Sequence, residues 1–195
     1  MGGRRRNERA DVTVGILTVS DRAAAGEYED RGGPAVEAHL AARIAPGWTP
    51  VRKLVSDDRL RVEEGIVALA DAGAGLVVTT GGTGVGPRDV TPEATEAVCD
   101  RLLPGFGEAM RAASLAETPM AILSRAVAGV RGATLVVNLP GSPRAVAVCL
   151  DAVLPAVPHA LEQIGAARLP LSGGPGPPRL ASSPEEQQGD DGGRA

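Results

Sequence analysis

The sequence predicts an α/β fold with a mostly parallel, doubly wound sheet and a small hairpin near one edge. Two observations predict this fold class. Apolar runs rich in β-branched residues, typical of strands buried on both faces, alternate along the chain with segments whose apolar residues have helical spacing. Of the 195 residues, 43% are hydrophobic but only 2% are aromatic, so Val, Leu, Ile and Ala must build the core of one domain.

Five elements are predicted ahead of the glycine-rich segment that starts at Gly81: a strand at 12–20, a helix at 34–44, a strand at 50–56, a helix at 58–73 and a strand at 74–80. Pro34 suits the first turn of its helix, where a missing N–H group costs nothing. Asp57 or Asp58 is expected to cap the second helix, and Gly73 is expected to end it.

The second half of the chain predicts a helix at 91–103, another that follows Pro104, two strands within 125–141 and a last helix at 142–164. The two strands are expected to form a hairpin that turns at about residues 131–132. Thr91 is the predicted N-cap of the first helix, with Pro92 in its first turn and Glu93 beside the positive end of its dipole. Pro155 and Pro158 are expected to bend or break the last helix.

The two ends of the chain have little to bury. Residues 1–10 form a charged arm, and residues 168–195 are mostly Gly, Pro, Ser and acidic residues. Both segments are predicted to be disordered, which leaves 11–167 as the ordered domain. The N-terminal arm lacks the apolar segment of a secretory signal, and no run approaches transmembrane length. A cytoplasmic protein without a membrane partner is therefore predicted.

Charge and cysteine content exclude some functions. A net charge of −4 disfavours nucleic acid or an anionic membrane as the main partner. Cys99 and Cys149 lie far apart and outside any CxxC pattern, so they are interpreted as small buried residues in a reducing compartment. His39 and His159 have no other metal-ligating residues near them in sequence. A metal site built from Cys and His is not predicted.

Polar clusters come directly after predicted strands, at residues 20–22, 56–58, 81–89 and 138–143. Ligands of doubly wound sheets bind outside the carboxyl ends of the strands. The four clusters are therefore expected to meet on one rim of the sheet.

The segment GGTGVGPRD, residues 81–89, has the properties of an anion-binding loop. Its four glycines can adopt positive φ angles and let backbone N–H groups approach a phosphate in front of a helix N-terminus. It is neither a Walker A loop nor a GxGxxG motif. Gly141 and Ser142 lie just before another predicted helix and form a second candidate anion site.

Asp89 is an unusual neighbour for a phosphate, because the two negative charges repel each other unless a cation or donor lies between them. Mg²⁺ or a ring N–H group of a heterocycle would resolve this conflict. The structural alternatives are a salt bridge to Arg88 or a turn-stabilising hydrogen bond. Asp21 could likewise pair with Arg22, and one of the acids at 57 and 58 could be only a cap.

Several long motifs occur in order along the chain: TVSDRAAAGEYEDRGGPA, TTGGTGVGPRDVTPEAT, LPGFGEAMR, LSRAVAG and VVNLPGSP. Together they resemble the molybdenum-cofactor biosynthesis family that includes molybdopterin adenylyltransferase, and the likeness covers residues 12–164. It implies a three-layer α/β/α domain, a homotrimer, and hand-over of product to a molybdenum insertion protein. It also implies Mg²⁺-dependent transfer of AMP from ATP to the terminal phosphate of molybdopterin, with release of pyrophosphate.

The resemblance also implies roles for individual residues. Asp57 and Asp89 match the family's functional carboxylates, and we expect them to act in catalysis and to hold Mg²⁺. Ser56 stands where relatives often have Pro. With Gly141 from the second anion site, the expected substrate-binding residues are Ser20, Asp21, Gly81, Gly82, Thr83, Gly84, Thr91, Pro92, Glu93, Gly141 and Ser142.

Two other functions are compatible with part of this pattern. A paralogue could bind molybdopterin or a nucleotide without turning it over. A purely structural trimer would account for the apolar content but not for the polar rim. Retention of both acids and of LPGSP favours the enzyme.

Overall fold

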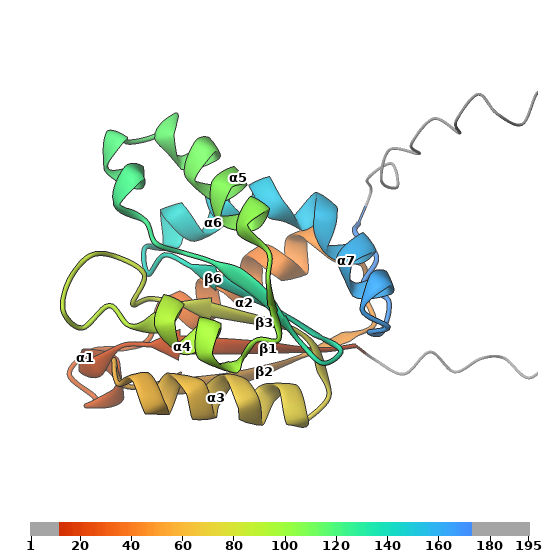
Figure 1. Ribbon diagram of the computed structural model, residues 1–195, viewed down its shortest axis with the longest axis horizontal. Helices are drawn as coiled ribbons and strands as arrows, with labels where there is room; N and C mark the ends of the chain where they lie inside the picture. The colour runs from red at the N-terminus through yellow and green to blue at the C-terminus, as the bar shows by residue number, and fades with distance from the viewer. Residues whose placement is uncertain (1–11, 173–195) are drawn as a thin grey trace, which may run out of the picture.

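A computed structural model describes residues 12–172 of the chain. In this part six strands form one sheet with helices on both faces, which gives the three-layer α/β/α arrangement of Figure 1. The strands are β1 Val12–Val19, β2 Trp48–Val55, β3 Ala74–Thr80, β4 Arg101–Leu102, β5 Ala128–Arg131 and β6 Thr134–Leu139. The helices are α1 Asp21–Ala24, α2 Gly32–Arg43, α3 Arg59–Asp71, α4 Thr91–Val98, α5 Pro104–Leu115, η1 Pro119–Leu123, α6 Pro143–Val153, η2 Leu154–Ala156 and α7 Val157–Gln163. The predicted fold class is confirmed.

The strand order is β2-β1-β3-β6-β5-β4. The pairs β2–β1, β1–β3 and β3–β6 are parallel, whereas β6–β5 and β5–β4 are antiparallel. The predicted hairpin is β5–β6, and it lies next to the edge strand β4. Strand order reverses between β1 and β3, so the crevice beyond the carboxyl ends of these two strands is the expected ligand position.

Neighbouring side chains of β1 enter two different cores, because side chains alternate across a strand. Ile16 packs in the larger core, with α2, α5, α6 and α7, while Leu17 packs in the smaller core with α3 and α4. Helix α3 lies close to β1 where Gly65 faces Leu17, since a Cβ at Gly65 would lie 2.9 Å from Leu17 Cδ1. This close packing fixes the strand from which the Ser20–Asp21 loop extends.

Two helix starts differ from prediction. Helix α2 begins at Gly32, two residues before Pro34, because Asp30 Oδ1 accepts hydrogen bonds from the N–H groups of Gly32 and Gly33. Thr91 is inside α4 and is not its N-cap. Its hydroxyl instead donates to Gly81 O, at 2.9 Å. The side chain that the local sequence predicted to cap α4 therefore makes a tertiary hydrogen bond to the glycine loop.

Helix α4 is also shorter than predicted, and residues 101–102 form the edge strand β4. Asp100 N donates to Val130 O and Leu103 N donates to Ala128 O, so this segment pairs with β5. Arg131 Nη1 donates to Val98 O at 3.0 Å and satisfies the carboxyl end of α4. These partners come from the distant hairpin, and the local pattern could not indicate them.

The last predicted helix is broken, as expected, where η2 separates α6 from α7 near Pro155. Together they make a 21-residue stretch, Pro143–Gln163, with the length and composition to cross a membrane, although no run of that length is expected from the sequence. Val146, Leu150 and Leu161 are buried in the larger core, however, as expected for a helix that covers a sheet.

The packed chain continues past the expected end at residue 167. Leu169 is buried, Leu171 pairs with Ile44, and Ser172 N donates to Arg43 O at 2.7 Å. The predictions for residues 1–10 and for the rest of the C-terminal tail lie outside the described residues.

Candidate active site

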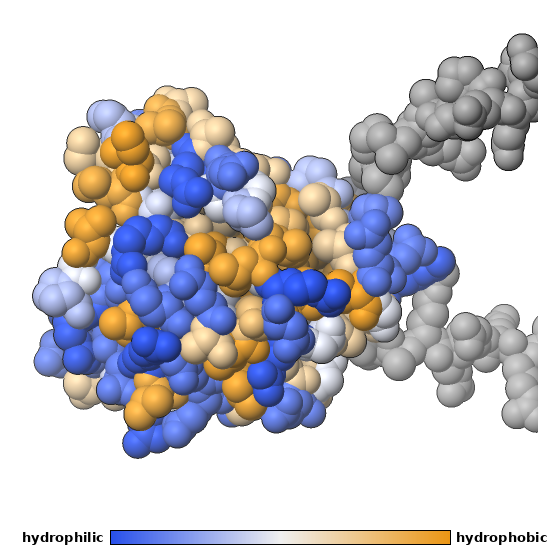
Figure 2. Space-filling view, viewed as in Figure 1, coloured by the Kyte–Doolittle hydropathy of each residue, from blue (hydrophilic) through white to orange (hydrophobic). Residues whose placement is uncertain are grey.

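The four polar loops that follow β1, β2, β3 and β6 meet at one end of the sheet. In Figure 1 this is the left end, where α1 and the long loop between β3 and α4 lie. Asp21 contacts Asp57 across the first two loops, and Gly141 approaches Gly81 across the last two, where a Cβ at Gly141 would lie 3.4 Å from Gly81 Cα. Figure 2 shows hydrophilic surface over this end and apolar surface above it, over α5 and η1.

Asp21 and Asp57 are tied by reciprocal hydrogen bonds. Asp21 N donates to Asp57 Oδ2 at 2.7 Å, and Asp57 N donates to Asp21 Oδ1 at 2.9 Å. Arg88 Nη2 donates to both Asp21 oxygens, at 2.8 Å each, and Arg88 Nε to Oδ2 at 3.0 Å. Asp21 therefore pairs with Arg88, while Arg22 pairs with Glu27.

The structure separates the roles of the two adjacent acids after β2. Asp58 caps α3 by accepting from Arg61 N, which leaves Asp57 free to face the glycine loop. Burial raises the pKa of the Asp57 carboxyl, opposed by the hydrogen bond from Asp21 N and reinforced by the carboxylate charge of Asp21. The Arg88 guanidinium, in contrast, holds the pKa of Asp21 below its usual value. The rim thus contains two linked carboxyls with opposite pKa shifts.

The first two glycines of the loop allow a close approach that no other residue would permit. Gly81 has a φ of 102° and Gly82 a φ of 64°. A Cβ at Gly81 would lie 2.3 Å from Val19 O, and one at Gly82 would lie 2.4 Å from Thr91 Oγ1. The N–H groups of Gly82, Thr83 and Gly84 donate to no acceptor within residues 12–172. The loop therefore presents three consecutive donors.

Asp89 folds back on its own loop. Its Oδ2 accepts from Gly86 N at 2.8 Å, and a Cβ at either Gly84 or Gly86 would lie 2.9 Å from that oxygen. Gly84 and Gly86 are therefore needed to leave room for the Asp89 carboxylate. Neither has the positive φ angle that the sequence predicts for the glycines of this loop. Asp89 forms the turn-stabilising hydrogen bond and no ion pair with Arg88. Its Oδ1 accepts no hydrogen bond in the described part of the chain.

A cleft with a volume of about 480 Å³ opens between the glycine loop, α5, η1 and the start of α6. Six expected substrate-binding residues line it together with Asp89: Gly81, Gly82, Thr83, Gly84, Gly141 and Ser142. A smaller hollow of about 220 Å³ lies on the other side of Gly81 and Gly141, lined by Ser20, Tyr28 and Asp30. Gly81 and Gly141 therefore form a narrow ridge between two adjoining cavities.

Comparison with known proteins identifies the family. Residues 15–159 match the family model described as "Probable molybdopterin binding domain". The chain belongs to this family. It is 46% identical over 154 residues to a molybdopterin adenylyltransferase of Helicobacter pylori, which covers 78% of this chain and 88% of the relative. An enzyme with the same name from Escherichia coli K12 is 44% identical over 143 residues, 73% of each chain.

Solved structures of the family have the same fold. The molybdopterin biosynthesis enzyme MoaB from Thermus thermophilus superposes with a TM-score of 0.72 at 47% identity, covering 78% of this chain and 96% of the other. The molybdopterin biosynthesis Mog protein from Mycobacterium ulcerans gives a TM-score of 0.72 at 42% identity, covering 78% and 99%. The resemblance inferred from the motifs is therefore confirmed.

Three residues expected to bind substrate lie behind the glycine loop of this family member. Thr91 and Pro92 are buried, and neither they nor Glu93 line the two cavities. The acids Asp21 and Asp57 are also outside both linings, on the rim beside the loop. Thr91 secures Gly81, and Glu93 forms an ion pair with Arg125. Their positions suit residues that hold the loop in shape.

Sequence reasoning missed Arg125 as a site residue. Its Nε donates to Gly84 O at 2.6 Å, its guanidinium also donates to Asp89 O and Glu93, and its backbone N–H donates to Thr83 O. Arg125 therefore fastens both ends of the glycine loop. A signal was present in the LSRAVAG motif, where a single Arg precedes a buried strand.

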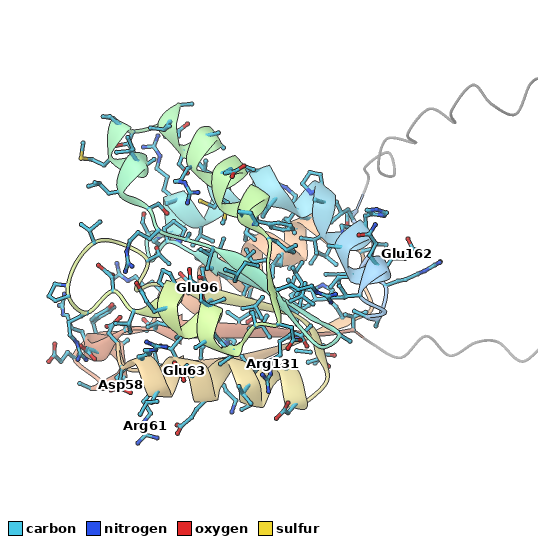
Figure 3. The ribbon with its side chains drawn as sticks, in the orientation of Figure 1. Asp58, Arg61, Glu63, Glu96, Arg131 and Glu162 are labelled. Carbon is cyan, nitrogen blue, oxygen red and sulfur yellow. The ribbon has the colours of Figure 1, made fainter. Side chains whose placement is uncertain are left out.

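A larger hollow of about 580 Å³ lies at the opposite end of the sheet, beside Ala74, Arg131 and Gly132. In Figure 3 Arg131, which lines this hollow, lies well to the right of Asp58 at the start of α3. The amino ends of the parallel strands are not where doubly wound sheets bind ligands. The smaller cleft beside the glycine loop is therefore the candidate active site.

Proposed function

We propose that this protein is a molybdopterin adenylyltransferase, which transfers AMP from ATP to the terminal phosphate of molybdopterin in molybdenum-cofactor biosynthesis. The observation that supports it most is the meeting of Asp57 and Asp89, beside a cleft, around three backbone N–H groups that have no acceptor within residues 12–172, in a chain of this family. Relatives of similar length that bear this enzyme's name are 44–46% identical to the chain.

The reaction joins a phosphate oxygen of molybdopterin to the α-phosphorus of ATP and breaks the bond between the α-phosphorus and the bridging oxygen. The displaced pyrophosphate takes the bond's electron pair. Because the phosphate is itself the nucleophile, the protein must mainly position two anions and neutralise charge. The N–H groups of Gly82, Thr83 and Gly84 would hold a phosphate, and Ser142 at the start of α6 would hold a second anionic group.

The residues present fit Mg²⁺. Carboxylate oxygens are its preferred ligands, and it is commonly held by one or two carboxylates together with substrate phosphates. Asp57 Oδ1 and Asp89 Oδ1 accept no hydrogen bond within residues 12–172, and no group of three potential metal-ligating side chains gathers there as a ready-made cage. Bound Mg²⁺ would neutralise charge on the phosphates, while Asp57 and Asp89 orient it and the nucleophile.

The same family assignment supports three further proposals. The protein assembles as a homotrimer, acts in the cytoplasm, and hands its adenylylated product to a molybdenum insertion protein. Sedimentation equilibrium tests the homotrimer. The chemistry proposed for the cleft does not depend on these three proposals.

The deciding experiment measures pyrophosphate release from ATP and Mg²⁺, with and without molybdopterin, for the unaltered protein, Asp57→Asn and Asp89→Asn. The proposal expects release that requires molybdopterin and falls at least about 100-fold in both variants. Tight molybdopterin binding without release would instead identify a binding paralogue. Asp151→Asn is a suitable control, because Asp151 lies on α6 and contacts His39 and Arg43 outside the cleft.

A further inference from the structure

Arg88 is the one Lys or Arg of the glycine loop, and it points at a carboxylate that belongs to the rim. It donates to both oxygens of Asp21, although residues 82–84 of the same loop offer three N–H groups suited to a phosphate. A guanidinium binds carboxylate and phosphate with the same two-pronged geometry. The loop therefore carries a phosphate-binding group that the protein itself occupies.

The Arg88–Asp21 ion pair is easily broken. The side chain of Arg88 is 62% exposed and that of Asp21 is 42% exposed. Water competes well for such pairs, and their net contribution to stability is small. Asp21 would also keep a second tie after Arg88 left, because Asp57 N still donates to its Oδ1. Loss of the ion pair would therefore leave the two loops connected.

The charges on the rim favour the movement of Arg88 from Asp21 to a phosphate when a phosphate binds. The rim has the carboxylates of Asp21, Asp57 and Asp89, and Arg88 is the cation whose charge acts on both Asp21 and Asp57. Arg59 and Arg61, which follow Asp57 and Asp58 in the sequence, pair with Glu63 and Glu64 on α3. A phosphate bound by the loop would meet repulsion from the acids and attraction from Arg88.

We propose that Arg88 is a substrate-phosphate ligand that exchanges Asp21 for a phosphate when the nucleotide or pterin substrate binds. This inference rests on the proposed function for the identity of the substrate, but not for the exchange itself. The exchange frees both oxygens of Asp21 from Arg88, while Oδ1 keeps the hydrogen bond from Asp57 N. It thus couples phosphate binding to exposure of the acidic pair.

The test is binding of inorganic pyrophosphate to the full chain, measured by titration calorimetry with EDTA present so that no divalent cation contributes. Arg88→Gln should weaken binding at least about tenfold, the effect of losing a charge-assisted hydrogen bond. The pyrophosphate affinity of Arg88→Lys should lie between those of the unaltered protein and of Arg88→Gln, since Lys offers a point charge without the two parallel donors of a guanidinium. Asp21→Asn should strengthen binding about two- to fivefold, because the competing acceptor is weakened.

A matched control separates direct contact of Arg88 with the phosphate from the general effect of removing one positive charge. Arg61→Gln removes the same charge from a side chain of similar exposure, 66%, that points away from the sheet in Figure 3. It should change pyrophosphate affinity by less than about twofold at physiological salt. All variants should keep the melting temperature of the unaltered protein within about 2 °C, since exposed ion pairs stabilise little.

The double variant Asp21→Asn/Arg88→Gln decides between exchange and the alternatives. Exchange predicts that Asp21→Asn gives no gain once Arg88 is absent. If Asp21→Asn raised pyrophosphate affinity equally with and without Arg88, the Asp21 charge would act only by long-range repulsion. If both single variants bound pyrophosphate more weakly, the ion pair would serve only to hold the two loops together. Either result, or no measurable pyrophosphate binding, overturns the proposal. Failure of turnover with the predicted binding pattern would instead count against the adenylyltransferase assignment alone.

Discussion

Asp21 and Asp57 each accept a hydrogen bond from the backbone N–H group of the other, at 2.9 and 2.7 Å. This relationship joins the loops after β1 and β2, so two carboxyls from adjacent strands are fixed without a bond between their side chains. It also leaves Asp57 Oδ1 beside Gly82, where a Cβ would lie 3.4 Å from it. The acid that faces the phosphate loop is thus held by the backbone of its neighbour.

Asp57→Asn should make the protein more stable at pH 7 while removing activity. Burial raises the pKa of Asp57, so the folded protein binds its proton more tightly than the unfolded chain does. Stability from this group is therefore greatest below the ordinary value of 3.8 and falls as pH rises through the folded value. Asn keeps the acceptor for Asp21 N without the charge.

Thermal unfolding at several pH values checks this prediction. The melting temperature of Asp57→Asn should exceed that of the unaltered protein by about 1–2 °C at pH 7 and match it near pH 3. A lower melting temperature at pH 7 would mean that the Asp57 charge stabilises the fold, contrary to its environment.

Gly82→Ala should disrupt the loop far more than Gly132→Ala disrupts the β5–β6 hairpin. Both glycines have positive φ, 64° and 54°, so both variants carry backbone strain of about 1–2 kcal/mol. A Cβ at Gly132 meets nothing within 4 Å, whereas one at Gly82 would lie 2.4 Å from Thr91 Oγ1. Equilibrium unfolding in urea should show an additional loss of at least about 1 kcal/mol for Gly82→Ala. Equal losses in the two variants would show that contact with Thr91 is unimportant.

Arg125→Lys should loosen the glycine loop, because an ammonium group cannot reproduce the donations to Gly84 O, Asp89 O and Glu93 together. We expect a loss of about 1–3 kcal/mol in stability and at least tenfold in pyrophosphate affinity. Arg131→Lys is the matched control: it removes a similar donation, to Val98 O, at the far end of the sheet. It should lower stability without changing pyrophosphate affinity. A loss of affinity equal to that of Arg125→Lys would contradict the role of Arg125 in holding the glycine loop.

Sequence alone could predict the strands and the rim because those features depend on local pattern. A run such as residues 74–80 must be buried on both faces, and parallel strands bring their carboxyl ends to one edge. Which of Asp57 and Asp58 capped α3 could not be decided, because either residue is close enough and only the backbone direction selects one.

The unforeseen features depend on contacts between distant parts of the chain. Arg125 lies 36 residues after Asp89, and no periodicity connects them. Thr91 has the sequence signature of an N-cap, but its hydroxyl donates to Gly81 O instead. Helix α4 ends early because Val130 and Arg131 bind the backbone that would have continued it. At Thr91 and at the end of α4 a tertiary hydrogen bond replaced the local one.

Asp151→Asn should lower stability without affecting activity. Asp151 on α6 accepts hydrogen bonds from His39 and Arg43 of α2, which joins two helices away from the cleft. Burial opposes its ionisation, yet the hydrogen bonds from Arg43 and His39 outweigh burial and hold the pKa of Asp151 below its usual value. The stability from Asp151 is therefore present above pH 3.8 and is lost as pH falls through the lower, folded value.

Because the Asp151 side chain is 47% exposed, the loss at pH 7 should be only about 0.5 kcal/mol, or roughly 1–2 °C in melting temperature. Glu162→Gln is the control, since its pair with Arg168 joins no two helices and is more exposed, at 60%. It should change the melting temperature by less than about 1 °C. Melting curves at pH 7 and pH 3 check the sign: the deficit of Asp151→Asn should shrink at the lower pH. A deficit that grows with acid would show that the Asp151 charge does not join α2 to α6.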